Sequence, residues 1–530
     1  MKQATYHTFK LMKFYVKRNR WKTAFWLLGL IVLTLIIPQS FANLYPNEKE
    51  LIPVFEMFKS PAMEAMLGQA HLSQVNLATM FSYEMQLFTV ILVGIMNILF
   101  VSKDTRGDEE DGRLELLSAL PIGRHAVILS TVFQQVLINA VLGCVIAIGL
   151  MFTGIDHFTA EGAWLYGLSL TASGFMLGMM TLVIAQLAST YSQTMGISMG
   201  LLLIMYLLRA VGDVSLSWLS DVVPLGWISQ TAVYSENNWW PVYALLGLAA
   251  ALCVLAFVLN SQRDAQAGLL PERKGHAHAS SLLKSPLGLQ LRLQRTGLIV
   301  WSIGMLVLGL SYGSVFGDLE SFFKTNPMLQ RMLTGKGDNY AEQFVPILMA
   351  IMGMVSTIPV LMAAFKIRKA MRLSHTEIVL SHAVSRVHYV MSFIWIGLFN
   401  SIAMISFAAL GMYVGAASSM KTPIAFDKIM YAGWVFIPAI LIFLGLAVLV
   451  IGWIEKASLL VYLYLGYTFF VIYLGQLLNV KQWMKDLTPF GHVPRLPIAD
   501  MDWAATLMML VIGLLLIVFG VIGFKRKDIG

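Results

Sequence analysis

The chain has 530 residues, of which 58% are hydrophobic and only 12% are charged. A soluble globular domain carries about 25% charged residues, so this composition excludes an ordinary soluble protein. The apolar runs 25–38, 127–152 and 501–524 hold almost no charge. They lack the polar residue at every second position that a membrane barrel strand requires, so we expect an all-α polytopic membrane protein.

The chain begins with a basic segment, 5–22, in which Phe9, Met12 and Val16 can line one helical face and lysines another. This pattern predicts a helix in the inner headgroup layer, with a counterpart at 284–296. A plain basic flank that orients the first span explains the charge almost as well. The apolar run that follows has no small-residue cleavage site, so we expect a retained helix and not a signal peptide.

The apolar runs predict about twelve membrane-spanning helices, because a helix needs about 20 apolar residues to cross a bilayer. With the N-terminus in the cytoplasm, 26 of the 37 Lys and Arg residues fall on the inner side and 11 on the outer side. The positive-inside rule then places both termini in the cytoplasm. The spans are expected at 23–42, 82–101, 127–153, 163–188, 194–211, 240–259, 297–316, 343–365, 389–415, 430–453, 457–477 and 503–523.

The second half of the sequence echoes the first in five places that occur in the same order. These matches predict two parallel six-helix pseudo-repeats, 1–265 and 284–530, joined by a cytoplasmic linker at 266–283, with a pathway between them. Duplication for structural reasons alone is the alternative. The matched pairs are Arg20, Trp26 and Gly29 with Arg295, Trp301 and Gly304; Phe58, Lys59 and Met66 with Phe323, Lys324 and Met332; Glu115 and Arg124 with Glu377 and Arg386; Asp221, Pro224 and Gly226 with Asp486, Pro489 and Gly491; and the basic ends Arg263 and Lys525–Lys527.

The segment 102–126 lies between two spans on the cytoplasmic side, and 366–388 is its copy. It is strongly polar, then forms a short amphipathic turn over Leu114–Leu120 and stops at Pro121. A short helix here must bury its apolar residues in lipid or in a partner, and the charges on both flanks favour a partner. The acidic run Asp108–Asp111 by itself reads as a solvated loop.

The residues Glu-Asp-Gly-Arg-Leu-Glu-Leu-Leu-Ser-Ala-Leu-Pro-Ile-Gly-Arg at 110–124 resemble the cytoplasmic loop of type-2 ATP-binding-cassette (ABC) exporter permeases. The chain is most similar to the double-length permeases of the tetronasin and polyether-ionophore resistance group. The resemblance implies that 102–126 and 366–388 are coupling helices that dock into ATPase subunits, and two copies are expected because each half offers one docking site. It places Glu115, Arg124, Glu377 and Arg386 at these contacts.

The second copy departs from the motif, since Ser374-His375-Thr376 stands where Asp-Gly-Arg is expected and Ala383 replaces Pro121. We therefore expect the two halves to bind their ATPase subunits unequally. The chain has no phosphate-binding loop of its own; Gly335-Lys336-Gly337 is the nearest echo. It is thus expected to be no enzyme and to hold no cofactor or metal, with ATP and Mg²⁺ bound by the partner ATPase.

Two turns on the outer side carry the pairs Pro224, Gly226 and Pro489, Gly491. The resemblance implies short re-entrant helices that form an outer gate; a proline-broken turn at the membrane interface is an equal alternative. Arg209 is the one basic side chain inside an apolar run, and it either snorkels to the headgroups or faces the exit path and attracts an anionic group. Neutral polar residues within spans join helices or line the path, the path candidates being Asn97, Gln134 and Asn400.

The function expected is export of an amphipathic, hydrophobic small molecule, such as a polyether ionophore or polyketide antibiotic, across a bacterial plasma membrane. A secondary transporter is less favoured, because no Asp or Glu lies near the middle of a predicted span. A membrane enzyme lacks clustered metal ligands. A sensor or scaffold coupled to an ATPase stays open. Nucleic acid is not an expected partner, because the basic residues gather at the lipid surface.

Overall fold

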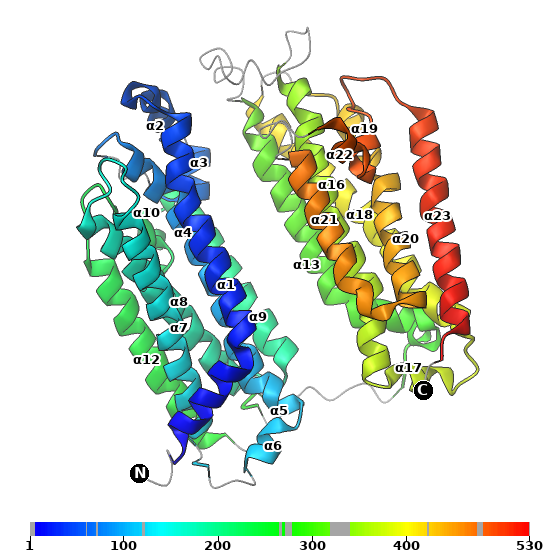
Figure 1. The fold of residues 1–530 in the computed structure, drawn as a ribbon, viewed down its shortest axis with the longest axis horizontal. Coiled ribbons are helices and arrows are strands. Elements are labelled where there is room, and N and C mark those ends of the chain that lie inside the picture. Colours follow the sequence, from blue (N-terminus) through cyan, green and yellow to red (C-terminus); the bar gives the residue numbers. More distant parts are fainter. Residues whose placement is uncertain are drawn as a thin grey trace. The chain divides into compact units, whose positions relative to one another are not determined.

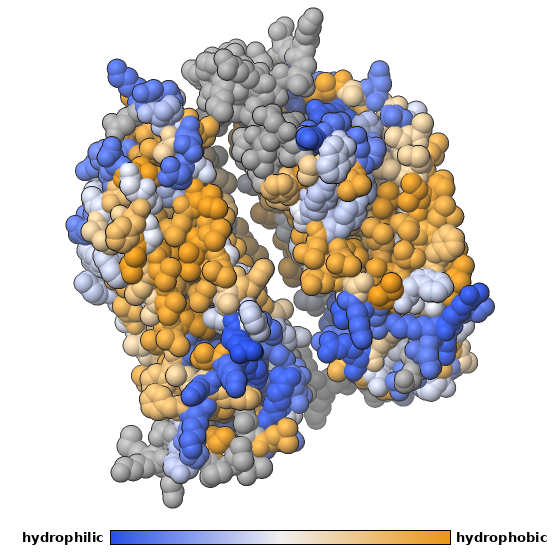
Figure 2. All heavy atoms as spheres, in the orientation of Figure 1, coloured by the Kyte–Doolittle hydropathy of each residue, from blue (hydrophilic) through white to orange (hydrophobic). Residues whose placement is uncertain are grey.

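The computed structural model describes residues 6–59, 61–69, 73–118, 122–123, 125–263, 268–270, 278–317, 340–420, 423–473 and 481–528. All regular structure in these ranges is helical, and twelve of the helices are long and apolar enough to cross a membrane. The prediction of an all-α polytopic membrane protein is therefore confirmed. Figure 2 shows an apolar band across each half of the chain, with hydrophilic residues at both ends of the band.

The chain divides into two compact units, Met1–Lys274 and Gly275–Gly530. In the first unit, drawn from blue to green in Figure 1, the short helices lie between the long ones at either end. Its helices are α1 (Thr8–Leu44), η1 (Glu48–Leu51), α2 (Ile52–Phe58), α3 (Pro61–Leu67), α4 (Leu77–Ser102), η2 (Lys103–Gly107), α5 (Asp108–Glu110), α6 (Arg113–Ser118), α7 (Ala126–Met151), α8 (Ala160–Leu187), α9 (Tyr191–Val214), α10 (Ser217–Val222), α11 (Gly226–Ser229) and α12 (Trp240–Gln262).

The second unit contains a similar succession of long helices with short helices between them. They are η3 (Ser281–Lys284), α13 (Pro286–Ser314), α16 (Tyr340–Arg372), α17 (His375–Leu380), α18 (Arg386–Ser419), α19 (Phe426–Trp434), α20 (Ile437–Trp453), η4 (Glu455–Ala457), α21 (Ser458–Tyr473), α22 (Gln482–Asp486), η5 (Pro489–His492) and α23 (Trp503–Arg526).

Local sequence sets where many of the long helices begin. The first backbone N–H groups of a helix have no partner within it, and a Ser, Thr, Asp or Asn side chain can accept from one of them. Six long helices start in this way, and the capping residues are Asn76, Thr159, Thr190, Ser285, Ser385 and Asp502.

Small residues let the helices of each unit approach closely, as is usual in membranes. In the second unit a Cβ added at Gly309 of α13 would lie 2.1 Å from the Ala408 carbonyl oxygen of α18, and one at Gly411 would lie 2.1 Å from that of Leu306. In the first unit α8 packs against α4, α7 and α12 and forms the centre of the core. The backbones of these helix pairs therefore fix the shape of each unit.

Two predicted boundaries are wrong. The separate helix expected over 5–22 continues into the first span as α1, which at 37 residues is about 55 Å long and exceeds the roughly 30 Å hydrocarbon core. No helix breaker lies at the junction, and 284–296 likewise belongs mostly to α13. The span expected at 430–453 is found as Phe426–Trp453, with a break between α19 and α20, where Pro438 has no N–H to donate to Trp434.

Candidate functional site

The segment that follows α4 is folded throughout, and it is anchored by buried charges. The helix α4 passes directly into η2, a single π-helical turn over Lys103–Gly107, and then into α5 and α6. This turn and α5 bury the side chains of Asp104, Asp108 and Glu109. A buried carboxylate needs a matched charge or several hydrogen bonds, and each of these has them.

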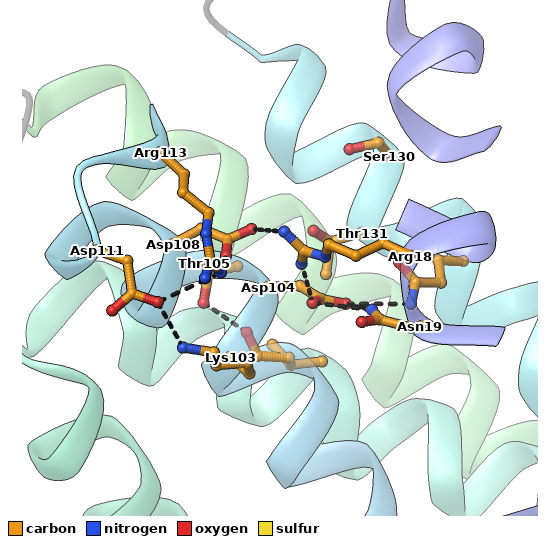
Figure 3. Close-up of polar contacts among 12 residues, drawn as sticks. Arg18, Asn19, Lys103, Asp104, Thr105, Asp108, Asp111, Arg113, Ser130 and Thr131 are labelled. Atoms are coloured by element: carbon orange, nitrogen blue, oxygen red, sulfur yellow. Dashed lines mark hydrogen bonds and ion pairs between the residues drawn. The ribbon is translucent and has the colours of Figure 1, made fainter. Parts of the chain in front are cut away.

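Asp104 and Asp108 attach α1 to this segment. The Arg18 guanidinium of α1 donates to Asp104 Oδ1 at 2.5 Å and to Asp108 Oδ2 at 2.6 Å, and Asn19 Nδ2 donates to Asp104 Oδ2 at 2.8 Å. Gln134 Nε2 of α7 adds a third donor to Asp104 at 3.1 Å. Figure 3 shows Arg18 and Asn19 directed at the two carboxylates. We call Arg18, Asn19, Asp104, Asp108, Arg113 and Gln134 the carboxylate cluster.

The same cluster fixes the start of α6. Arg113 donates to the second oxygen of Asp108 at 2.9 Å and lies 3.3 Å from Asp111 Oδ2. Lys103 donates to Asp111 at 2.8 Å, in a pair that is more exposed to solvent than the Asp104 and Asp108 pairs. Asp108 thus joins α1 to the first residue of α6, so that a displacement of α6 acts on the first membrane-spanning helix.

A second group of charges ties the segment to two further helices. Arg106 donates to Glu109 at 2.9 Å and to the Ala185 carbonyl oxygen of α8 at 2.6 Å. Arg263, which follows α12, donates to the other oxygen of Glu109 and to Gln186 Oε1. The segment 103–113 is therefore bound to α1, α7, α8 and the end of α12.

The interpretation of Asp108–Asp111 as a solvated loop is wrong for Asp108 and Glu109, because these two side chains are buried and paired with arginines. Arg18 and Arg263 come from distant parts of the chain, and Arg106 lies three residues before Glu109. Sequence reasoning also missed Arg18 and Asp104. One signal was available: Asp104 and Asp108 are four residues apart and so share a helical face. Their partner 86 and 90 residues away had no local signal.

Both units place a short helix directly after their second long helix, and each short helix exposes an apolar side chain. Leu116 on α6 is 75% exposed and Ile378 on α17 is 61% exposed. The separation between them, 262 residues, is the same as that between Glu115 and Glu377, and both glutamates are exposed. The two short helices thus expose an apolar residue and a glutamate at corresponding positions of the two units.

The other predicted coupling residues have mixed outcomes. Glu377 accepts a hydrogen bond from Ser374 Oγ at 3.1 Å. Arg386 is exposed and donates to the backbone carbonyl oxygens of Lys525 and Lys527, at 3.2 and 2.8 Å, so in this structure it holds the C-terminal segment. Arg124 lies outside the described residues, as do Pro121 and the matched motif at 323–333.

The described residues of the second unit contain no counterpart of the carboxylate cluster. At the same separation of 262 residues, Lys366 and Ala370 stand where Asp104 and Asp108 stand in the first unit. Instead Glu455, in the turn between α20 and α21, binds Lys527 at 2.9 Å and Arg368 at 3.3 Å. These ion pairs join α16 and the turn after α20 to the C-terminal end, and among the ion pairs of the described residues none joins them to α13.

Arg209 neither snorkels nor faces an open path in this structure. Its side chain is fully buried within the first unit, where it pairs with Asp213 at 2.8 Å and donates to the Ala65 carbonyl oxygen of α3 at 2.6 Å. Ser220 Oγ of α10 donates to the other oxygen of Asp213 at 2.5 Å. Arg209 therefore joins α9 to the short helices α3 and α10, which corrects both readings of this residue.

The three neutral path candidates have partners on neighbouring helices. Asn97 of α4 and Asn139 of α7 form a reciprocal pair at 3.0 and 2.7 Å. Gln134 belongs to the carboxylate cluster, and Asn400 donates to the Pro359 carbonyl oxygen of α16 at 3.3 Å. All three are buried, so they join helices here, and a role in the path stays a prediction.

The two outer turns share one geometry. Gly226 begins α11 directly after α10, and a Cβ added there would lie 2.2 Å from the Ser220 carbonyl oxygen. At Gly491, in η5, the added Cβ would lie 2.1 Å from the Lys485 carbonyl oxygen. Each glycine thus packs against the carbonyl six residues earlier. The turns connect short helices, while their role as a gate stays a prediction.

The loop after α11 is packed against α4. Ser82 and Thr79 of α4 donate to the Val233 and Tyr234 carbonyl oxygens at 2.8 and 3.2 Å. Burial raises the pKa of the Tyr234 phenol above its ordinary value, so this group stays protonated at physiological pH.

The twelve candidate spans define an all-α multi-pass membrane protein. Comparison with known proteins defines the family. The family model described as the C-terminal domain of the multidrug efflux system permease Rv1217c matches residues 12–259 and 283–525, and the chain belongs to this family.

One curated relative is the multidrug efflux system permease protein Rv1217c of Mycobacterium tuberculosis (strain ATCC 25618 / H37Rv). It is 29% identical over 535 residues, an alignment that covers 98% of this chain and 95% of the relative. The comparisons thus support a multidrug efflux permease and do not extend to the tetronasin-resistance group specifically.

Proposed function

We propose that the chain is the permease subunit of an ATP-driven ABC exporter that extrudes amphipathic drug-like molecules, among them polyether ionophores or polyketide antibiotics. The chain spans a bacterial plasma membrane with both termini in the cytoplasm. Two ATPase subunits, which bind ATP and Mg²⁺, dock on the segments 102–126 and 366–388. Family membership and the printed name of the relative support multidrug efflux.

The observation that carries the ATPase coupling is the pair of exposed apolar residues, Leu116 and Ile378, on short helices anchored to the spans. A docked helix needs an apolar contact for affinity and a rigid base to transmit force. The first unit supplies the base through Asp108, which binds both α1 and α6. Glu115 and Glu377 lie beside the apolar residues and add charge complementarity.

The buried carboxylates favour this function over a secondary transporter. In the described ranges, each buried Asp or Glu side chain is paired with an arginine: Asp104 and Asp108 with Arg18, Glu109 with Arg106, and Asp213 with Arg209. A carboxylate that carries protons through a transport cycle must exchange its charge; the arginine partners stabilise the charged form of these four, while burial acts against it.

The test uses the tagged permease purified from its own membranes and reconstituted in liposomes. We expect a co-purifying subunit with a phosphate-binding loop, whose ATP hydrolysis an ionophore stimulates. The variant Leu116→Asp/Ile378→Asp should lose that subunit, whereas Leu270→Asp, an equally polar change at an exposed residue, should keep it. Export that persists without ATP and follows a proton gradient would contradict the proposal. ATP hydrolysis that no transported compound stimulates would favour a sensor or scaffold.

A further inference from the structure

The first unit contains an open groove that lies directly above the carboxylate cluster. Its volume is about 480 Å³, within the usual range for small-molecule sites, and four elements line it: α1, α4, η2 and the start of α9. The lining residues are Asn19, Trp21, Lys22, Phe25, Trp26, Leu99, Phe100, Lys103, Asp104 and Tyr191.

The groove has an apolar wall and a polar end. Trp21 and Phe25 are 76% and 78% exposed, and with Trp26 and Phe100 they form an aromatic wall. Lys22, Lys103 and Asn19 form the polar end. Aromatic residues beside lysines at the end of an apolar helix are typical of the membrane interface, so the groove suits a ligand with an apolar body and a charged head.

The charges at the polar end favour an anionic head. The three aspartates Asp104, Asp108 and Asp111 are matched by the cations that bind them, namely Arg18, Lys103 and Arg113. Among the side chains that line the groove, Lys22 and Lys103 are the cations, and the carboxylate of Asp104 is already held by Arg18 and Asn19. Glu110, whose Oε1 accepts from the Tyr191 backbone N–H at 2.8 Å, lies beside the groove and does not line it. The Lys103 ammonium lies 5.8 Å from the Tyr191 ring and is 37% exposed, so it can also reach a ligand.

We infer that this groove binds an anionic amphiphile, with a carboxylate or phosphate between Lys22 and Lys103 and an apolar body against Trp21, Phe25 and Trp26. The inference depends on the proposed export function in one respect only: if the chain is an exporter, the bound molecule is its cargo. The same chemistry is presented by an anionic lipid headgroup, and the experiment separates these two sources.

The groove also lies where binding can act on the coupling segment. Lys103 is the first residue of η2, and Asp104, which lines the groove, is held by Arg18. An anion that draws Lys103 away from Asp111 removes one contact of a carboxylate that also binds Arg113, the first residue of α6. Occupancy of the groove is thereby linked to the position of α6.

The experiment measures binding of dansyl-undecanoic acid and of its uncharged methyl ester to the full-length permease in phosphatidylcholine nanodiscs, with empty discs subtracted and without ATPase. Lys22→Gln should raise the Kd of the acid about fivefold, which corresponds to about 1 kcal/mol, the energy of a partly exposed charge pair. The double variant Lys22→Gln/Lys103→Gln should raise the Kd about tenfold or more. The Kd of the ester should change less than about twofold. Lys22→Arg should retain binding of the acid.

The matched control is Lys17→Gln, the same change at an exposed residue of α1 outside the groove. Equal effects of Lys17→Gln and Lys22→Gln, or equal effects of Lys22→Gln on acid and ester, would overturn the inference. Energy transfer from tryptophan to dansyl should fall in Trp21→Phe/Trp26→Phe; unchanged transfer would place the ligand elsewhere and also overturn it.

Added phosphatidylglycerol distinguishes the two sources. If the lipid competes and raises the Kd of the acid, the natural occupant is a lipid headgroup. If the Kd stays unchanged, a free anionic amphiphile is favoured. Both results support an anionic site. The binding measurements contain no ATPase, so they do not depend on the proposed function. A chain that binds the acid but supports no ATP-driven export would contradict the proposed function and not the inference about the groove.

Discussion

At the scale of single residues, Asp104 and Asp111 are two aspartates of one segment in opposite environments. Asp104 is 1% exposed and accepts from Arg18, Asn19 and Gln134, whereas the side chain of Asp111 is 41% exposed. Asp104→Asn should lower the free energy of unfolding by about 2–3 kcal/mol, because the largely buried guanidinium of Arg18 then has Asp108 as its one remaining carboxylate among the contacts described above. Thermal unfolding in detergent measures the change.

Asp111→Asn is the matched control, and it should cost less than about 1 kcal/mol because its pairs with Lys103 and Arg113 are screened by solvent. Equal shifts of the melting temperature in the two variants would show that burial of Asp104 does not contribute to stability as the contacts indicate.

Arg209 gives a second prediction, which separates a structural role from attraction of cargo. Arg209→Met leaves Asp213 buried without its cation and should destabilise the protein by about 3–5 kcal/mol. Arg209→Met/Asp213→Leu removes both charges and should recover most of this loss. We expect the double variant to export carboxylated and uncharged compounds in the same ratio as the natural chain; a selective loss of the carboxylated compounds would restore the role of Arg209 in cargo recognition.

These residues also show which part of the site was predictable from sequence. Asp213 follows Arg209 by one helical turn, so their pairing was open to local reasoning. Arg18 and Asp104 are separated by 86 residues, and each occurs in a polar stretch with a simpler explanation. Only the packing of α1 against α4 and α7 makes them partners.

At the scale of elements, the two outer turns give a matched pair of predictions. Gly226→Ala and Gly491→Ala each place a Cβ about 2 Å from a backbone carbonyl oxygen, and the backbone must move, at a cost of about 1–3 kcal/mol. Both variants should increase protease cleavage at these turns and reduce efflux. Gly200→Ala and Gly466→Ala, which meet nothing within 4 Å, should behave as the natural chain; efflux reduced equally by all four variants would contradict this account.

The spans were predictable because twelve apolar runs of sufficient length have few other stable arrangements than membrane helices. Element ends depended on weaker signals. The continuity of α1 arises because basic residues such as Lys17 and Lys22 are as compatible with a helix as the apolar residues after them. The π-helical turn at 103–107 had no sequence signal that we can identify.

At the scale of the whole molecule, the two units differ in how the coupling segment meets the first long helix. In the first unit Arg18 of α1 binds Asp104 and Asp108. At the matched separation of 275 residues, Arg18 corresponds to Leu293, which is exposed on α13, and the second unit uses Glu455 to hold Lys527 and Arg368 instead. Force applied to α6 therefore has a direct charged connection to α1, whereas the described residues provide no such connection between α17 and α13.

This difference predicts unequal effects of charge reversal at the two coupling helices. Glu115→Lys should reduce both ATPase docking and export. Glu377→Lys should reduce docking similarly but export less, because the first unit still transmits the motion of its ATPase to α1. The measurements are the amount of co-purified ATPase and the rate of ionophore efflux from the same membranes.

The double variant Glu115→Lys/Glu377→Lys should lose export entirely.

A further variant, Arg18→Gln, separates docking of the ATPase from transmission of its motion to the spans. Arg18→Gln changes no exposed residue of the two short helices but removes the connection between α1 and the two aspartates, so its thermal stability is measured alongside. We expect it to bind ATPase normally and to export as poorly as Glu115→Lys. Unchanged efflux in Arg18→Gln, or in the double charge reversal, would contradict the coupling route, because the segment 102–126 would then not transmit motion through the carboxylate cluster.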